Sequence, residues 1–378
     1  MKAKNTIPRN RFLPEGISLL RQLNAKALPT TLNLGLGKPE EDMPVVLRPL
    51  MQVALSESSL EYTENAGDLK TREALSGRFK LNGAASLLLT HGAQEGLMAA
   101  LLATLNHGDE VLLPDPGFLA YAPMVRMLGA KPVSYTLKLV QNAYHHDLTL
   151  IKSKITSRTR AIILSSPGNP TGCDLEEAEF SALLKLIKTK KMIILSDEVY
   201  GMLHFKKPYF PLATLSDRVI SVNSFSKSHA LTGWRIGFVA TCDQALARSC
   251  LVAHQYIATC ASVPAQRFLE QLLKSPLFES VAMDYKSRYQ NKLSLFREHS
   301  SPKLREKTPL VSGGFYLFPK LPKKQSSVQF CEELLRKENV LAVPGVAFGK
   351  NGEGSIRLSL ALPDEQVIKA AQVLSKYY

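Results

Sequence analysis

The fold is decided by residues 219–227, which read Val219-Ile220-Ser221-Val222-Asn223-Ser224-Phe225-Ser226-Lys227. An apolar run at 219–222 ends in a hydroxyl-rich turn that carries Lys227. The run predicts a buried strand, and a lysine directly after it can leave water and react as a neutral amine. Arg235 follows eight residues later, and an arginine together with two serines suits a phosphate group. The alternative is a surface turn with a solvated lysine, because most lysines are exposed.

Composition indicates an ordinary soluble globular chain. It has 378 residues, of which 45% are hydrophobic and 21% charged, and this length suits two domains. We expect an N-terminal arm with part of a small domain in residues 1–40, a large domain in 41–285 and a small C-terminal domain in 286–378. No apolar run reaches the roughly 18 residues needed to cross a membrane. The five cysteines are widely spaced without a CxxC pair, which argues against disulfides and structural zinc and favours the cytoplasm.

The charge balance is basic, with 47 Lys and Arg against 33 Asp and Glu and a net charge of +14. A basic excess can indicate nucleic-acid binding. The basic residues are scattered, however, and their short clusters lack interleaved aromatic residues, so we expect a solvated surface that steers anionic ligands. Residues 1–12 are basic, but Pro8 and Pro14 break any targeting helix. We interpret them as an arm that leads into a helix near 17–27.

The middle of the chain alternates short apolar runs with longer amphipathic stretches. This pattern predicts an α/β fold, with a three-layer large domain built on a mostly parallel sheet. We expect strands at 86–90, 110–114, 131–135, 161–165, 192–196, 219–223 and 237–240. The last third has a long helical stretch at about 275–299 and short strands near 315–318 and 356–360, which indicates a smaller α+β domain.

Polar motifs follow three of the predicted strands. Ser166-Pro167-Gly168-Asn169 follows 161–165, Asp197-Glu198 follows 192–196, and Ser224 to Lys227 follows 219–223. Ligands of open α/β sheets bind beyond the carboxyl ends of the strands. The three motifs therefore predict one shared crevice.

These motifs contain the groups that a pyridoxal phosphate enzyme needs. It needs a lysine for the aldehyde, an acid for the pyridine nitrogen, donors for the phenolate oxygen, a phosphate cradle and a cation for the substrate carboxylate. Asp197 suits the acid, because a buried carboxylate needs a cationic partner, although a helix N-cap is the alternative. Asn169 and Tyr200 suit the donors, although Asn169 can be part of a simple turn and Tyr200 a core residue.

The remaining groups come from other parts of the chain. Gly92-Ala93-Gln94-Glu95-Gly96 opens a predicted helix, where small residues leave backbone N–H groups free for phosphate. Phe118 can stack on a cofactor ring or simply pack. Arg357 lies on an apolar predicted strand and should face a carboxylate, from a substrate or from an internal Asp or Glu. The sequence has no GxxxxGK[ST] or GxGxxG fingerprint, so a nucleotide is not indicated.

In this order, the motifs resemble the class I and II aminotransferase family, of the fold shared with aspartate aminotransferase. The resemblance runs from about Asn33 to near the C-terminus. It implies pyridoxal 5'-phosphate as cofactor, with Lys227 as the Schiff-base lysine and Asp197 on the pyridine nitrogen. It further implies Asn169 and Tyr200 at the phenolate oxygen, Phe118 on the ring, and a phosphate site made by Ser224, Ser226, Arg235 and the backbone of Ala93 and Gln94. The substrate α-carboxylate would be bound by Arg357, Gly37 and Asn169.

The resemblance also implies the reaction. An amino group passes from an L-amino acid to a 2-oxo acid by a ping-pong mechanism, with Lys227 as general base and acid and with Asp197 and Tyr200 as further catalytic groups. Tyr62 matches a tyrosine that the family supplies to the phosphate of the neighbouring subunit, which implies a homodimer. No metal, nucleic acid or membrane is implied.

Two departures from the family leave the substrate open. Ala93 stands where one aspartate-using subgroup has a lysine for the distal carboxylate, and Glu41 stands where relatives have an apolar residue. Lys38 can serve a distal carboxylate or be a solvated lysine. A C–S β-lyase, decarboxylase or ring-forming lyase would use nearly the same residues. A binding-only protein would have lost Lys227, Asp197 or Arg357, and all three are present.

Overall fold

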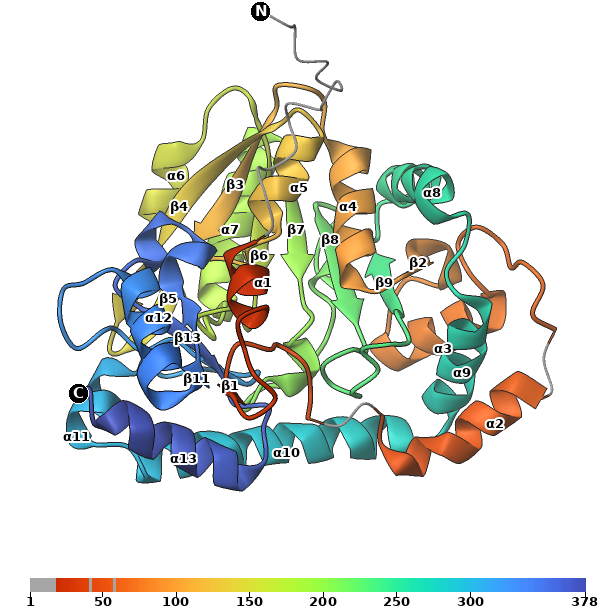
Figure 1. The fold of residues 1–378 in the computed structure, drawn as a ribbon. Coiled ribbons are helices and arrows are strands. Elements are labelled where there is room, and N and C mark those ends of the chain that lie inside the picture. The colour runs from red at the N-terminus through yellow and green to blue at the C-terminus, as the bar shows by residue number, and fades with distance from the viewer. Residues whose placement is uncertain (1–17, 41–42, 57–58) are drawn as a thin grey trace, which may run out of the picture.

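The computed structural model describes residues 18–40, 43–56 and 59–378 (Figure 1). The expected N-terminal arm, the first residue of the expected helix at 17–27, and Glu41 lie outside these described residues. The helix found there, α1 (Leu19–Asn24), is shorter than expected, because Ser18 is its N-cap and residues 25–27 are no longer helical. Over the described ranges, none of the helices has the length and apolar character that a membrane span requires.

An eight-stranded sheet forms the centre of the molecule. Its order is β2-β9-β8-β7-β6-β3-β4-β5, and β8, β7, β6, β3 and β4 pair in parallel. The predicted α/β fold with a mostly parallel sheet is therefore confirmed. The strands are β2 (Leu87–Thr90), β3 (Glu110–Asp115), β4 (Lys131–Val140), β5 (Ala143–His146), β6 (Thr159–Ser165), β7 (Ile193–Asp197), β8 (Val219–Ser224) and β9 (Gly237–Ala240).

Most strands lie within a residue or two of their predicted bounds, because strands buried on both faces are continuous apolar runs. The sequence missed the end of β4 and all of β5. These two strands form an antiparallel hairpin whose turn residues, Gln141 and Asn142, both have positive φ. Exposed and buried positions are mixed along this half of β4, so no apolar run marks it. β9 also departs from the parallel order, since it pairs antiparallel with both neighbours.

Helices cover both faces of the sheet, which gives three layers (Figure 1). Alternate side chains of each strand point to opposite faces, so Leu112 joins one apolar cluster while Val111 and Leu113 join the other. One face packs against α4 (Ala93–Thr104), α5 (Tyr121–Met127) and α8 (Gln244–Ala258). The other packs against α3 (Leu69–Phe79), α6 (Leu148–Lys154), α7 (Glu177–Lys190) and α9 (Val263–Lys274).

The last third of the chain builds a third apolar cluster. The long helix α10 (Leu277–Glu298) leads to a three-stranded sheet of order β10-β13-β12, and β1 (Leu32–Asn33) pairs in parallel with β11 (Val340–Leu341). The division at residues 40 and 285 stays a prediction. The other elements are α2 (Arg48–Ser56), β10 (Tyr316–Leu317), α11 (Pro302–Lys307), α12 (Ser327–Glu338), β12 (Val343–Pro344), β13 (Ile356–Ser359) and α13 (Asp364–Ser375).

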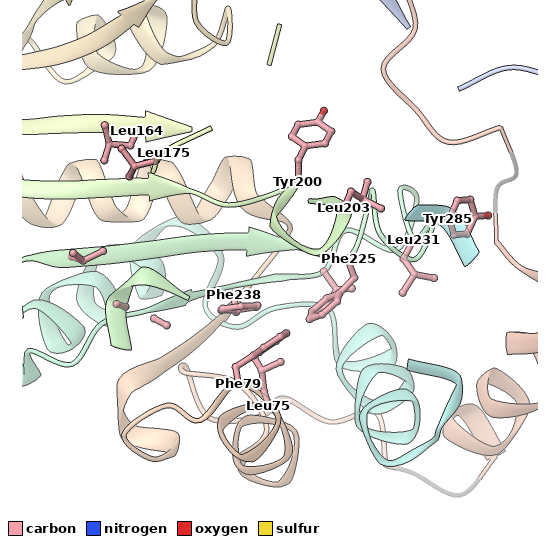
Figure 2. Packing of buried hydrophobic residues seen from close by; sticks show 14 of the residues in the cluster. Leu75, Phe79, Leu164, Leu175, Tyr200, Leu203, Phe225, Leu231, Phe238 and Tyr285 are labelled. Atoms are coloured by element: carbon pink, nitrogen blue, oxygen red, sulfur yellow. The ribbon is translucent and has the colours of Figure 1, made fainter. Parts of the chain in front are cut away.

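Phe225 anchors the turn that carries Lys227. Its ring is fully buried, with centroids 6.0 Å from both Phe238 and Phe278. Figure 2 shows Phe225 beside Phe238 and Phe79 beneath the end of the sheet. Ser224 and Ser226, two predicted site residues, are the chain neighbours of Phe225. The packing of this ring therefore holds the backbone of both serines in place.

We expect Phe225→Ala to lower the free energy of unfolding by about 3–5 kcal/mol, since it leaves a cavity in a close-packed cluster. Chemical denaturation can be followed through Trp234, the only tryptophan. Met283→Ala is the control, because Met283 is 64% exposed on α10 and its loss should change stability by no more than about 0.5 kcal/mol. Equal effects of the two substitutions would contradict the anchoring role.

Candidate active site

The site lies where β6, β7 and β8 end. Parallel pairing sets Ser165 opposite Asp197 and Asp197 opposite Val222, so the loops that follow start side by side. A cavity of about 380 Å³ opens there. All predicted site residues except Tyr62 line it: Gly37, Ala93, Gln94, Phe118, Asn169, Asp197, Tyr200, Ser224, Ser226, Lys227, Arg235 and Arg357.

Lys227 projects into this cavity from the turn after β8. Its Nζ donates a short hydrogen bond to the carbonyl oxygen of Gly37. Burial, followed by the charges of Arg357 and Arg235, lowers the pKa of Lys227 to about 8. A much larger fraction of this amine is therefore neutral and nucleophilic near neutral pH than of an ordinary lysine.

Asp197 is buried as the last residue of β7. It accepts hydrogen bonds from Tyr121 Oη at 2.5 Å and from the Val199 N–H at 3.3 Å. Burial raises the pKa of Asp197 in spite of these two donors. In the described ranges no Lys, Arg or His side chain forms an ion pair with Asp197. The short helix that follows, Gly201–Leu203, has Tyr200 and not Asp197 as its N-cap. The N-cap alternative therefore does not hold, and a protonated ring nitrogen would supply the cation that this carboxylate needs.

Donors for a phosphate gather at the N-terminus of α4. The hydroxyls of Ser224 and Ser226 lie 2.8 Å apart, and the first N–H groups of a helix have no partner within the helix. The Arg235 guanidinium is held here by carbonyl oxygens, with Nη1 3.0 Å from Thr232 O and Nη2 3.2 Å from His91 O. Gly92 has φ +79°, and a Cβ there would lie 2.7 Å from Arg235 Nη2, so a side chain would fill the cradle.

Arg357 is only 2% exposed, on β13. Its Nη2 donates to Gly35 O at 2.6 Å, and its Nη1 lies 3.4 Å from Asn169 Oδ1. The guanidinium carbon lies 4.3 Å from the centre of the Tyr316 ring. Nε has no hydrogen-bond partner, and no carboxylate of the described residues pairs with this cation. An internal ion pair, the alternative left open by the sequence, is thus not what this arginine makes. The geometry fits a carboxylate from outside.

The other predicted residues complete the walls. The Tyr200 hydroxyl donates to the Tyr316 hydroxyl at 3.2 Å, and both tyrosines belong to the buried apolar cluster and also line the cavity. The Phe118 ring packs edge-on against Tyr121, with centroids 5.4 Å apart. Tyr62 lies elsewhere, 86% exposed, and its role towards a neighbouring subunit stays a prediction.

Sequence reasoning missed Tyr121 and Tyr316. Tyr121 lies three residues after Phe118, a spacing that would place both on one side of a helical turn, and this was the available signal. Tyr316 lies within a predicted strand, and nothing in the sequence distinguishes it from a core tyrosine. Lys38, Leu20 and Thr232 also line the cavity, so Lys38 is not merely a distant surface lysine.

Together these groups fit pyridoxal phosphate. The cavity offers an amine with a lowered pKa, a buried carboxylate without a cationic partner, and a cluster of donors at a helix N-terminus. Each matches one part of the cofactor: the aldehyde, the ring nitrogen and the phosphate. A buried arginine remains free to bind a carboxylate beside them.

The fold is thus of the α/β class, and its cavity holds the groups that amino-group transfer with pyridoxal phosphate requires. The sequence pattern described as "Aminotransferase class I and II" matches residues 29–374. The chain therefore belongs to the class I and II aminotransferase family, whose members use pyridoxal phosphate. The family resemblance and the aminotransferase activity predicted from the sequence are confirmed.

The similarity to known aminotransferases extends over nearly the whole chain. The probable aspartate aminotransferase of Methanocaldococcus jannaschii is 30% identical over 96% of this chain and 97% of its own length. The aspartate aminotransferase of Pyrococcus horikoshii is 32% identical over 97% of both chains. The solved N-succinyldiaminopimelate aminotransferase of Mycobacterium tuberculosis superposes with a TM-score of 0.90, at 26% identity, over 98% of this chain and 100% of that one. These similarities do not favour the lyase alternative.

We expect Lys227 to react with an amine-specific reagent with a half-maximal rate near pH 8 rather than near 10.5. The neutral amine is the nucleophile, so the rate should rise as the pH increases through the pKa and level off above it. Labelling of the apoenzyme with trinitrobenzenesulfonate, followed by peptide mass spectrometry, measures this rate. Exposed Lys320 serves as the internal reference. Arg357→Leu should move the Lys227 midpoint upward, and a midpoint equal to that of Lys320 would contradict the geometry.

Proposed function

We propose that this aminotransferase moves an amino group from an acidic L-amino acid to a 2-oxo acid by a ping-pong mechanism. The observation that carries this proposal is the charge of the cavity. Four cationic side chains line it, Lys38, Lys227, Arg235 and Arg357, against one carboxylate, Asp197. Such a lining favours ligands with several negative charges. A phosphate, an α-carboxylate and a distal carboxylate would together match it.

Each residue that would hold the cofactor has one task. Ser224, Ser226, Arg235 and the backbone of Ala93 and Gln94 bind the phosphate, and Asp197 holds a proton on the ring nitrogen. Asn169 and Tyr200 donate to the phenolate oxygen, and Phe118 lies on the ring. When bound, pyridoxal phosphate supplies an aldehyde for the amino group and a ring that withdraws electrons from the substrate α-carbon.

Lys227 moves the proton at the substrate α-carbon. As a largely desolvated amine it would accept this proton and return it one atom beyond the amino nitrogen, at the carbon that comes from the cofactor aldehyde, so it would act first as base and then as acid. Tyr121 keeps the Asp197 carboxylate oriented through its 2.5 Å hydrogen bond. Arg357, Gly37 and Asn169 bind the α-carboxylate, and because Arg357 is buried among aromatic rings it orients the substrate as well as attracting it.

Lys38 supplies the preference for an acidic side chain in this proposal. It lines the cavity next to Gly37, and α1 contributes Leu20 to the same lining. Two relatives bear the name aspartate aminotransferase, which supports the same substrate class. The slot where one subgroup has its lysine holds Ala93, so this chain would bind the distal carboxylate from a different direction.

The active form we propose is a cytoplasmic homodimer. Tyr62 and Tyr256 are 86% and 83% exposed, and Asn65 Nδ2 donates to Thr259 O, so the two exposed tyrosines belong to adjoining segments. Exposed aromatic side chains that gather on one surface suit an interface. Tyr62 would reach the phosphate site of the second subunit. All five cysteines are free, which is consistent with a reducing compartment.

We expect Lys227→Ala to abolish transamination while the protein still binds pyridoxal phosphate without a covalent link. The phosphate donors and Asp197 remain, but no amine is left to move the proton. Keto-acid release from aspartate with 2-oxoglutarate measures the reaction, and cofactor absorbance after dialysis measures binding. Normal turnover by this variant would overturn the assignment of Lys227. If the unmodified enzyme transaminates neutral amino acids but not aspartate, the proposed acidic substrate class is wrong, while the assignment of Lys227 still stands.

We expect Lys38→Gln to raise the KM for aspartate by roughly tenfold and to leave the KM for a neutral donor such as alanine unchanged within about twofold. A charge-assisted hydrogen bond to the distal carboxylate would be lost only for the acidic donor. Steady-state kinetics with 2-oxoglutarate as acceptor gives both values. Lys320→Gln removes the same charge from an exposed position outside the cavity and should change neither. A parallel loss for both donors would argue against a distal contact.

A further inference from the structure

Residues 34–40, here called the strap, follow β1, and two of them, Gly37 and Lys38, line the cavity. The strap begins next to β1, where the Leu34 N–H donates to Leu341 O at 2.8 Å and Leu34 O accepts from the Ser359 N–H at 2.7 Å. Its start is therefore fixed by main-chain hydrogen bonds to β11 and β13.

The strap backbone contacts two of the four cations in the cavity, Lys227 and Arg357. Gly35 O accepts from Arg357 Nη2, and Gly37 O accepts from Lys227 Nζ. A Cβ on Gly37 would lie 2.0 Å from the Tyr316 hydroxyl, so the strap backbone rests directly on that ring. A displacement of the strap would therefore shift the partners of Lys227 and Arg357 together.

The far end of the strap reaches a buried lysine on α10. Lys292 is 5% exposed, and its Nζ lies 3.2 Å from Glu40 Oε2 and 2.8 Å from Asp364 Oδ1. It also donates to the carbonyl oxygen of Leu362. Figure 1 shows α13, which begins at Asp364, lying along α10. One ammonium group thus joins the strap, α10 and the start of α13.

We propose that Lys292 and Glu40 form a latch that fixes the strap over the cavity, and that both are positioning residues for substrate binding. The inference rests on the proposed binding of the α-carboxylate by Arg357 and Gly37. A buried ammonium is costly without partners, so Lys292 holds its carboxylates firmly. Glu40 is the partner that belongs to the strap, and Asp364 is the partner that belongs to α13.

The latch acts on binding rather than on the chemical step. A strap held in place keeps the Gly37 backbone and the Gly35–Arg357 contact in the arrangement that a carboxylate needs, so less conformational entropy is lost when the substrate binds. Lys227, which moves the proton, lies in the turn after β8, and Asp197 ends β7, so neither residue belongs to the strap. Release of the latch should therefore weaken binding of both substrates and spare turnover at saturation.

The two arms of Lys292 allow a matched experiment. Glu40→Gln removes the charge on the strap arm, and Asp364→Asn makes the same change on the α13 arm, while each variant leaves Lys292 one carboxylate. We expect Glu40→Gln to raise the KM for aspartate and for 2-oxoglutarate by roughly tenfold, with kcat within about twofold. Asp364→Asn should leave both KM values within about twofold. Both assays use the full-length holoenzyme.

Hydrogen exchange measured by mass spectrometry supplies a readout that does not depend on turnover. Amide exchange over residues 34–40 should be faster in Glu40→Gln and unchanged in Asp364→Asn. Unchanged exchange and unchanged KM in Glu40→Gln would overturn the latch. Equal changes in both variants, together with a lower Tm in both, would show that Lys292 is only structural. If the unmodified enzyme does not transaminate aspartate, the proposed substrate fails, while the exchange experiment still decides whether the latch exists.

Discussion

Parallel pairing of three buried strands is the constraint on which the site depends. β6, β7 and β8 are apolar on both faces, so their register is set by packing between two layers of helices. This register sets Ser165, Asp197 and Val222 side by side, and the chain must leave the sheet there in three adjacent loops. Asn169, Asp197 and Lys227, distant in sequence, thereby reach one cavity. Because these loops start at a rigid sheet, the side chains at their beginnings are held in fixed positions.

Three cations of the cavity share one feature, which is that backbone carbonyl oxygens hold them in place. Arg357, Lys227 and Arg235 are each held by backbone carbonyl oxygens, of Gly35, of Gly37, and of His91 and Thr232. Carbonyl dipoles orient these cations and partly compensate their desolvation, but they do not neutralise the charge as a carboxylate would. The cations therefore stay available to anionic ligands. The same proximity of like charges, added to burial, lowers the pKa of Lys227 and makes it an effective nucleophile.

Much of the fold and the candidate site could be predicted from the sequence, because both depend on local patterns of apolar and polar residues. Features without such a local pattern could not be predicted. Doubly buried strands are continuous apolar runs, and polar loops at their carboxyl ends stand out against them, so Asn169, Asp197 and Lys227 could be grouped. The β4–β5 hairpin lacks such a run and was missed. The contact of Tyr121 with Asp197, and the lack of an internal acid beside Arg357, depend on distances between segments far apart in the chain. No local pattern encodes them.

The strap shows why such contacts matter. It begins in main-chain pairing with β11, its middle contacts Lys227 in the turn after β8 and Arg357 on β13, and its end contacts a lysine of α10. Its sequence, with two glycines and a proline, has no helical or strand period and would be interpreted as a connecting loop. Yet Gly37 allows the backbone to approach Tyr316, and the carbonyl oxygens of Gly35 and Gly37 accept hydrogen bonds from two cations. A segment without regular structure thus connects β11 and α10 with the groups that line the cavity.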